Sequence, residues 1–320
     1  MNLIPHYPPH NDAPIEIALV NNMPDQAIEA TIEQFASLLR AGARDLNFRL
    51  RLYSMAGTTR SETARSLIAQ THEAIDMLYA RGADALVVTG AEPRAPQLTR
   101  EPYWDEFAQL VAWARVNTYG ALWSCLAAHG AVLALDGIER RREEHKISGV
   151  FACETTLNDW TMQGAPRVIQ VPHSRYNGLA REDLECCGYR VSSFSREVGV
   201  NNFWRREPSL FLFMQGHPEY GANTLLREFR RDALRYINEE TAIFPPTPAN
   251  YFSAVAVSGI ADLRDTADTT RRMRFLERMS ALLEAEAPQA IWRVYAERLY
   301  RNFLSQIAFE KAMRSRSLAI

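Results

Sequence analysis

Short apolar runs alternate with stretches of helical spacing through the first 125 residues, and this alternation restricts the fold more than any other feature. Ile15–Asn21, Ala85–Thr89 and Ala121–Ser124 have the length and apolar composition of buried strands. The segments Ser61–Leu78 and Trp104–Arg115 have helical patterns. Strands that alternate with helices form βαβ units, whose parallel strands make a sheet covered by helices on both faces. We therefore predict an α/β fold with its functional residues at the carboxyl ends of the strands.

Further segments extend this pattern along the chain. The spacing of Ile28, Ile32, Phe35 and Leu39 predicts a first helix, and Phe48–Tyr53 alternates like a strand. The second half predicts four more strands and one helix, at Ile147–Cys153, Arg167–Val171, Tyr189–Ser193, Leu210–Met214 and Thr224–Tyr236.

The chain divides into three predicted regions. Residues 1–14 contain four prolines and predict an extended arm, and residues 15–243 form the α/β core. Residues 244–320 begin with the proline-rich linker FPPTPAN. Apolar residues between Ile291 and Ile307 then recur at three- and four-residue steps, which predicts a C-terminal helical extension packed on the core.

The composition excludes several classes of protein. Hydrophobic residues make up 47% and charged residues 23%, a globular balance that excludes a disordered chain. A net charge of −2 provides no basic field for nucleic acid or an anionic membrane. Four cysteines without CxxC spacing predict neither a disulfide scaffold nor a zinc site, and we expect no bound metal. Because we find no apolar run near the ~18 residues of a membrane span and no secretory signal, we expect a cytoplasmic protein.

Cys125 is the first candidate for chemistry. It follows the strand-like Ala121–Ser124 and precedes a helical stretch rich in small residues. A cysteine on a strand-to-helix turn presents its sulfur at the sheet edge, and the helix N-terminus favours the thiolate. The alternative is that Cys125 is a small buried hydrophobic residue, as free cysteines often are.

The segment MQGHPEY is the second candidate. His217 and Glu219 follow a strand-like run and are two residues apart, so both side chains can project to one face. A histidine held by a carboxylate is the base of a nucleophile triad. Together with Cys125 at a second strand end, the pair predicts a Cys–His–Glu site.

Other polar residues allow competing interpretations. His129, four residues after Cys125, could be mistaken for the base or for half of a Cys-x3-His metal pair, but we find no further ligands nearby in sequence. The adjacent His173, Ser174 and Arg175 favour a hydrogen-bonded turn over a binding site.

Lys146 is one of only two lysines among 36 basic residues, the other being Lys311. It ends the run ERRREEHK, whose alternating charges are typical of a solvated face. A lysine that persists in such an arginine-rich chain can also have a function that arginine cannot replace, because the two differ in donor geometry and titration.

Together, these motifs resemble a known family over about Ile15 to Phe309. The match includes the opening IALVNNMPDQAIEATIEQFASLL and then, in order, TGAEP, YWDEF, the Cys125 turn, KISGVF, PHSRY, GHPEY, REFRRD and NYF. The chain is similar to the homoserine O-acyltransferases that begin methionine synthesis, the homoserine O-succinyltransferase group. The resemblance implies a flavodoxin-like, class I glutamine amidotransferase-like parallel-sheet core.

The resemblance also implies roles for individual residues. Cys125 matches the cysteine that takes the acyl group from acyl-CoA as a thioester, His217 the proton acceptor and Glu219 the carboxylate that orients it. The positions that match substrate-contacting residues are Lys146, Ser174 and Arg231. Acyl-CoA is then a co-substrate and homoserine the acceptor, with no permanently bound cofactor. The family is expected to be a homodimer.

Each tetrahedral intermediate on Cys125 would need N–H donors for its oxyanion. Our candidates are the amide of Leu126, next to the nucleophile, and an amide near Gly90 and Ala91.

The chain departs from the family pattern in ways that bear on the acyl donor. The family has Trp-Gly/Ala-x-Gln-Ala after the nucleophile, where this chain has LAAHG, and its N-terminal arm is longer. The position that sorts donors falls on Arg94, where the family has glycine for succinyl and glutamate for acetyl. A guanidinium facing the acyl pocket would pair with the free carboxylate of a succinyl group, so we predict succinyl-CoA as the donor.

Two rival functions share the same residues. A class I glutamine amidotransferase or related cysteine hydrolase also uses a cysteine and a His-Pro-Glu segment, but this chain lacks glycines two before and two after Cys125. A catalytically silent binding member of the fold is the second rival, and the joint presence of Cys125, His217, Glu219 and Lys146 argues against it.

Overall fold

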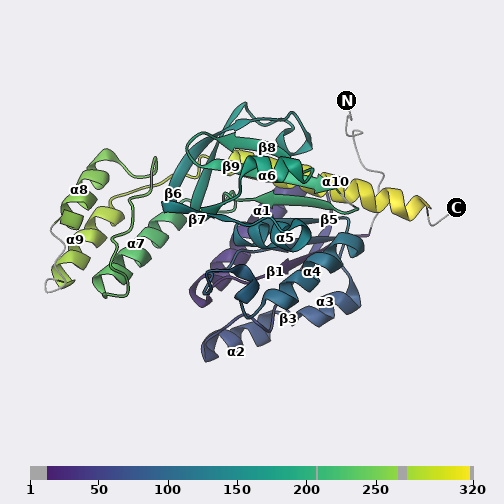
Figure 1. Cartoon of the computed structure of the whole chain (residues 1–320), viewed down its shortest axis with the longest axis horizontal. Coiled ribbons are helices and arrows are strands. Elements are labelled where there is room, and N and C mark those ends of the chain that lie inside the picture. Colours follow the sequence, from purple (N-terminus) through teal and green to yellow (C-terminus); the bar gives the residue numbers. More distant parts are fainter. Residues whose placement is uncertain (1–12, 207, 266–271, 318–320) are drawn as a thin grey trace.

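The computed structural model describes residues 13–206, 208–265 and 272–317. Most of the expected N-terminal arm, residues 1–12, lies outside the described residues. A single ten-stranded sheet runs through the molecule, in the order β3-β2-β1-β4-β5-β10-β9-β8-β6-β7. Helices lie on both of its faces (Figure 1). In the described ranges, no helix is both long and apolar enough to cross a membrane.

The first six strands of the sheet are parallel to one another, as the sequence predicts. In sheet order they are β3 (Glu73–Ala74), β2 (Phe48–Ser54), β1 (Ile15–Val20), β4 (Ala85–Val88), β5 (Gly120–Ser124) and β10 (Leu210–Met214). Strands β4, β5 and β10 are buried along their whole length. Burial on both faces is why their sequences are continuous apolar runs.

The other four strands are antiparallel to their neighbours. They are β9 (Gly199–Arg206), β8 (Arg190–Ser195), β6 (Arg141–Thr155) and β7 (Val168–Gly178). The sequence reading missed β9, and its preference for a turn at His173–Arg175 is wrong, because the segment PHSRYN lies inside β7. Most of the charged run before Lys146 belongs to β6, where Arg141 and Arg142 pair with Gly178 and Asn177 of β7, and its residues up to His145 are mostly exposed.

Two groups of helices cover the two faces of the sheet. α1 (Ile28–Ala43) and α10 (Arg293–Ser317) pack on one face, and α3 (Ile75–Arg81), α4 (Trp104–Asn117) and α5 (Leu126–Asp136) pack on the other. The remaining short elements are α2 (Glu62–Thr71), α6 (Arg181–Cys186) and the 3-10 turns Asp25–Ala27, Leu98–Arg100 and Trp160–Met162. Along β4, Val87 faces α1 and α10, whereas Leu86 and Val88 face α4 and α5.

The single helix predicted over Ser61–Leu78 is wrong. The chain leaves α2 at His72, whose extended backbone (φ −118°, ψ 149°) leads into β3 before α3 begins. β3 pairs with the end of β2, and the buried His72 ring stands at the junction. A two-residue edge strand is too short to leave a periodic signal in the sequence.

The C-terminal region contributes to two cores. α10 packs along α1 against the sheet, with Tyr300 and Phe303 fully buried. α7 (Thr224–Ile237), α8 (Ala254–Asp265) and α9 (Arg272–Glu284) surround a separate apolar cluster at one end of the molecule (Figure 1). The expected linker, residues 244–250, has no helix, and its Ala249 pairs with Gly149 of β6.

Candidate active site

Cys125 occupies a strained turn between β5 and α5. Its backbone has φ 50° and ψ −111°, a conformation that residues other than glycine rarely adopt. Its amide donates a hydrogen bond of 2.6 Å to the Met214 carbonyl at the end of β10, which fixes the turn to the neighbouring strand. The side chain is partly exposed. The predicted strand-to-helix turn at Cys125 is thus confirmed, and its geometry is that of a nucleophile elbow.

Backbone amides lie beside this turn. Gly90, just after β4, is so close that a Cβ built on it would lie 3.5 Å from the Leu126 nitrogen and 3.6 Å from the Cys125 Cβ. The Leu126 amide begins α5, where the first N–H groups have no acceptor within the helix. Ala91 follows Gly90 at the same edge of the sheet. Both predicted oxyanion donors therefore lie in segments that adjoin Cys125.

His217 and Glu219 follow β10, the strand next to β5. The Nδ1 atom of His217 lies 2.7 Å from Oε1 of Glu219, and both side chains are buried. The His217 amide donates to the Pro172 carbonyl at 2.7 Å, and the Tyr220 ring stacks on the imidazole with centroids 4.3 Å apart. The imidazole is thus held from its edge and from its face.

The imidazole of His217 interacts with both of its predicted partners. Burial favours the neutral ring, but the negative charges of Cys125 and Glu219, and hydrogen bonds to both, raise the pKa of His217 well above its usual value. Ser124 also donates to Oε1 of Glu219, at 3.3 Å. The three residues of the predicted Cys–His–Glu site therefore come together at the ends of β5 and β10.

His129 is turned away from this chemistry. It is buried, and its Nε2 lies 2.9 Å from Oε1 of Gln215. The Leu179 amide donates to the same oxygen, so Nε2 of His129 is the donor in its own contact. Burial lowers the pKa of His129 to about 3, which leaves the ring neutral. Among the described residues, no group of three or more His, Cys, Asp or Glu side chains is arranged to hold a metal ion.

His173 is a second buried neutral histidine near the site. Burial and the charges of Arg175 and His217 lower its pKa well below the usual value. Its Nδ1 accepts a long hydrogen bond of 3.4 Å from Nε of Arg175, whose guanidinium also donates to the Asn177 and Val198 carbonyls. His173 and Arg175 thus belong to a buried polar network next to His217.

Lys146 and Arg231 meet on one carboxylate. Nζ of Lys146 lies 2.6 Å from Oδ2 of Asp232, and Arg231 reaches Oδ1 of the same residue at 2.8 Å. The Lys146 side chain is only 8% exposed, so it is not part of a solvated face. Burial would raise the pKa of Asp232, but Lys146 and Arg231 outweigh it and hold that pKa below its usual value. Asp232 thus lies between two cations, and Arg235 approaches the same carboxylate at 3.9 Å.

Helix α7 connects this charged group to the surroundings of His217. The Tyr220 hydroxyl donates to Glu228 on α7 at 2.7 Å, one turn before Arg231. Arg235, one turn further along, pairs with Glu92 at 3.0 Å in the loop that follows β4. One helix therefore contacts the ring that stacks on His217, the two cations and the loop that follows β4.

Ser174 and Arg94 have different surroundings. Ser174 is half-buried in β7, where it pairs with Ser148, two residues after Lys146. The Arg94 side chain is exposed, and it lines a cavity of about 280 Å³ together with Ala91. The loop that carries Arg94 is held through its main chain: the amides of Arg94 and Ala95 both donate to Oε1 of Glu101, each at 2.7 Å. The role of Arg94 in selecting the acyl donor stays a prediction.

Comparison with known proteins identifies the family. The family model described as homoserine O-succinyltransferase matches residues 8–313. The chain belongs to the homoserine O-succinyltransferase family. It is therefore a transferase, as the sequence motifs indicate.

Relatives in this family match almost the whole chain. The homoserine O-succinyltransferase of Rhodopseudomonas palustris is 43% identical over 92% of this chain and 89% of its own length. That of Bradyrhizobium japonicum is 43% identical over 92% of this chain and 91% of its own. Among solved structures, a glutamine amido transferase from Methylobacillus flagellatus has a TM-score of 0.50 and 14% identity, covering 92% of this chain and 94% of that one. This likeness confirms the glutamine amidotransferase-like fold.

Sequence reasoning within this family pattern missed two positioning residues, Asp232 and Glu228. Asp232 is adjacent to Arg231 in the motif REFRRD, which was the available signal. Its contact with Lys146 spans 86 residues and could not be read from spacing. Glu228 lies in the same helix and is recognisable only once Tyr220 is known to face it.

Proposed function

We propose that the protein transfers the succinyl group of succinyl-CoA to the hydroxyl of homoserine through a thioester on Cys125. The observation that carries the proposal is the contact of Cys125, on its strained turn, with the buried His217–Glu219 pair. The names of the family relatives support the acceptor and the succinyl group.

The first half-reaction forms the thioester. The Cys125 thiolate attacks the acyl carbonyl of succinyl-CoA, and the bond between that carbon and the CoA sulfur breaks. The proton on His217 neutralises the departing CoA thiolate. The N–H groups of Leu126 and Ala91 are the proposed donors to the oxyanion of the intermediate.

The second half-reaction transfers the acyl group. His217 takes the proton of the homoserine hydroxyl as its oxygen attacks the thioester carbonyl, and the Cys125 thiolate leaves. Acylation has by then removed the thiolate charge that raises the pKa of His217. The ring is therefore an acid in the first step and a better base in the second, which suits ping-pong kinetics.

The charged group formed by Lys146 of β6 with Arg231 and Asp232 of α7 is the proposed site for the amino acid. Lys146 and Arg231 supply cations for the homoserine carboxylate, and Asp232 keeps both side chains in place. Ser174 remains a proposed substrate contact from the family pattern. A cytoplasmic location and a homodimer also remain expectations of the same pattern.

A thiol-release assay with several acyl-CoAs, against homoserine and serine, tests the function. We expect CoA release with succinyl-CoA and homoserine, and a succinyl mass on Cys125 when the acceptor is omitted. The Cys125→Ala variant should show neither. Release of ammonia from glutamine without CoA release would instead indicate a cysteine hydrolase, and a wild type inert to both and unlabelled at Cys125 would indicate a binding protein.

A further inference from the structure

Gln215 lies between the two segments that carry the proposed catalytic groups. It directly follows β10, stands two residues before His217, and is fully buried. Its Oε1 accepts hydrogen bonds from Nε2 of His129 and from the Leu179 amide, each at 2.9 Å. Its Nε2 donates to the Val200 carbonyl at 2.8 Å. The side-chain amide of Gln215 is therefore held in one orientation, in which His129 is a donor to it.

The contact with His129 closes a ring of bonds around Cys125. His129 lies on α5, one turn after Cys125, and its amide donates to the Cys125 carbonyl at 3.3 Å. The Cys125 amide in turn donates at 2.6 Å to the carbonyl of Met214, the residue before Gln215. Two hydrogen bonds, one between main chains and one between side chains, thus hold the start of α5 against the end of β10.

The main chain that leads from Gln215 to His217 is tightly packed. Gly216 alone separates the two residues. A Cβ built on Gly216 would lie 2.5 Å from Oδ1 of Asn201 and 2.6 Å from Cγ1 of Val171. Because close-packed interiors transmit displacements, a shift of Gln215 would be passed directly to His217.

His129 is an unfavourable residue for a contact that serves stability alone. Its ring is 2% exposed, and burial lowers its pKa to about 3, so the ring is neutral. Because Nε2 carries the hydrogen, Nδ1 is an acceptor, and within the described part of the chain it has no hydrogen-bond partner. A buried polar atom without a partner costs free energy that an apolar side chain would avoid. A polar side chain at this position therefore points to a role in geometry.

We propose that His129 is a positioning residue, which holds His217 at the correct distance from Cys125 through its hydrogen bond to Gln215. This inference rests on the proposed function, in which His217 exchanges protons with the groups that react at Cys125. Such transfers need heavy atoms within hydrogen-bond reach, and a misplacement of about 1 Å can cost about 100-fold in rate. The bond from His129 fixes Gln215 from the side of α5, so the two segments keep one relative position.

The test compares His129→Gln with His129→Met. The amide nitrogen of glutamine is about as far from the main chain as Nε2 of histidine, so it can still donate to Gln215, whereas methionine has no donor. The rate constant of thioester formation on Cys125, in single turnovers at saturating succinyl-CoA without acceptor, should fall about 10- to 100-fold in His129→Met. It should stay within about 3-fold in His129→Gln. The half-saturating concentration of succinyl-CoA should change in neither. His129→Phe, which keeps a ring without a donor, is a second test and should behave as His129→Met does.

Asn302→Leu is the control for a purely structural loss. Asn302 is 8% exposed on α10, and its Nδ2 donates to the Thr161 and Gln163 carbonyls at 3.4 and 3.1 Å. This variant should lower the free energy of unfolding but keep the rate constant. Unfolded protein reduces only the amplitude of thioester formation, so a loss of folded protein is distinguished from a misplaced His217.

The outcomes separate this inference from the function on which it rests. A wild type that forms no thioester on Cys125 would overturn both. If the wild type forms it, an unchanged rate constant in His129→Met and His129→Phe would overturn the role of His129 alone. Equal losses in His129→Gln and the variants without a donor would do the same, because the hydrogen bond to Gln215 would then not be what matters.

Discussion

At the scale of single residues, the charge on Cys125 decides the protonation of its neighbour. His217 is buried, which favours the neutral ring, yet its pKa is raised well above the usual value by two anions, Cys125 and Glu219. Under the proposed mechanism, acylation of the sulfur would remove one of these anions and leave Glu219, so that the acid–base state of His217 would change as the reaction proceeds.

This coupling predicts the titration of His217 in a variant. Cys125→Ala removes the thiolate and its hydrogen bond, so the pKa of His217 should fall toward the usual value, about 6.5. An NMR pH titration of the imidazole in the wild type and the variant measures the change. An unchanged His217 pKa would show that Glu219 alone sets it.

Under the proposed mechanism, we expect substitution of Asp232 to slow only the second half-reaction, the transfer to homoserine. Asp232→Asn keeps the shape but removes the anion between Lys146 and Arg231, so both cations lose their fixed positions. We expect kcat/KM for homoserine to fall about 10- to 100-fold, as for a lost charge-assisted hydrogen bond. Thioester formation on Cys125, followed by mass spectrometry, should keep its rate. A matching loss in thioester formation would place Asp232 in the first half-reaction.

At the scale of elements, the two halves of the sheet differ in how far sequence predicts them. Strands β1, β4, β5 and β10 were predicted because burial on both faces makes each one a continuous apolar run, whereas the two-residue β3 was missed. β9 was missed because it carries Asn201 and Asn202, whose polar character argues against a buried strand. Both are buried, and their amide side chains belong to a hydrogen-bonded network with Ser193 of β8. Such cross-strand compensation exists only in the folded protein.

The same reasoning explains which parts of the site were foreseeable. Cys125, His217 and Glu219 follow strands, and parallel topology alone brings the ends of β5 and β10 together. The contacts of Asp232 and Gln215 depend on side chains from distant segments, with no periodic signal. The alternating charges before Lys146 suggested a solvated face, because sequence does not reveal that the lysine is covered and paired.

Substitution of Gly149 tests the contact between β6 and the proline-rich segment, residues 244–250. Its φ of 145° is unfavourable for other residues, and an added Cβ would lie 2.4 Å from the Ala249 carbonyl oxygen. Gly149→Ala should therefore lower the free energy of unfolding by about 1–3 kcal/mol, from backbone strain and overpacking. Urea denaturation measures the loss.

Gly137→Ala is the control for that substitution. Gly137 also has positive φ, at 70°, but an added Cβ would meet nothing within 4 Å. Its cost should be about 1 kcal/mol, from backbone conformation alone. Equal losses in the two variants would mean that the contact with Ala249 contributes nothing.

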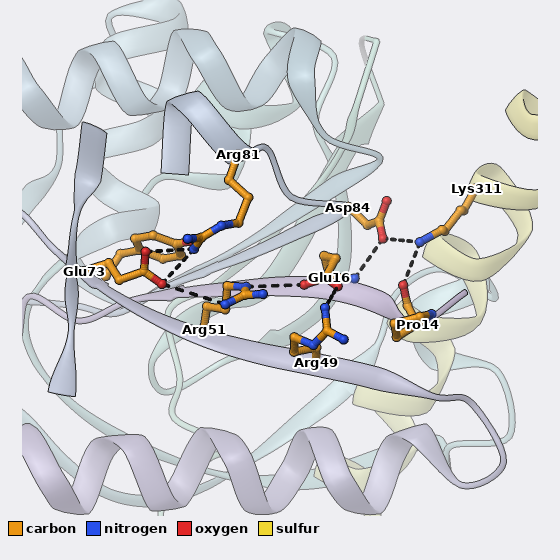
Figure 2. A network of polar contacts seen from close by, with 9 residues as sticks. Pro14, Glu16, Arg49, Arg51, Glu73, Arg81, Asp84 and Lys311 are labelled. Carbon is orange, nitrogen blue, oxygen red and sulfur yellow. Dashed lines mark hydrogen bonds and ion pairs between the residues drawn. The ribbon is translucent and has the colours of Figure 1, made fainter. Parts of the chain in front are cut away.

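At the scale of the whole molecule, Lys311 joins the two ends of the described chain. Its Nζ lies 2.7 Å from the Pro14 carbonyl and 2.6 Å from Oδ2 of Asp84, as Figure 2 shows. Asp84 also accepts a hydrogen bond from the Glu16 amide at the start of β1. Helix α10 is thereby fixed to the starts of the neighbouring strands β1 and β4. The second lysine of this chain thus has a structural contact.

The arrangement around Lys311 predicts a loss of stability without a loss of catalytic chemistry. Lys311→Met keeps the length of the side chain but leaves the Asp84 carboxylate, only 15% exposed, without its cation. Because the pair is mostly but not fully buried, we expect the free energy of unfolding to fall by about 1–3 kcal/mol. Arg40→Met removes the exposed pair with Glu33, whose side chains are 58% and 72% exposed, and should cost under about 1 kcal/mol. Urea denaturation of both variants decides the point, since equal losses would show that the contact does not hold α10 to the sheet.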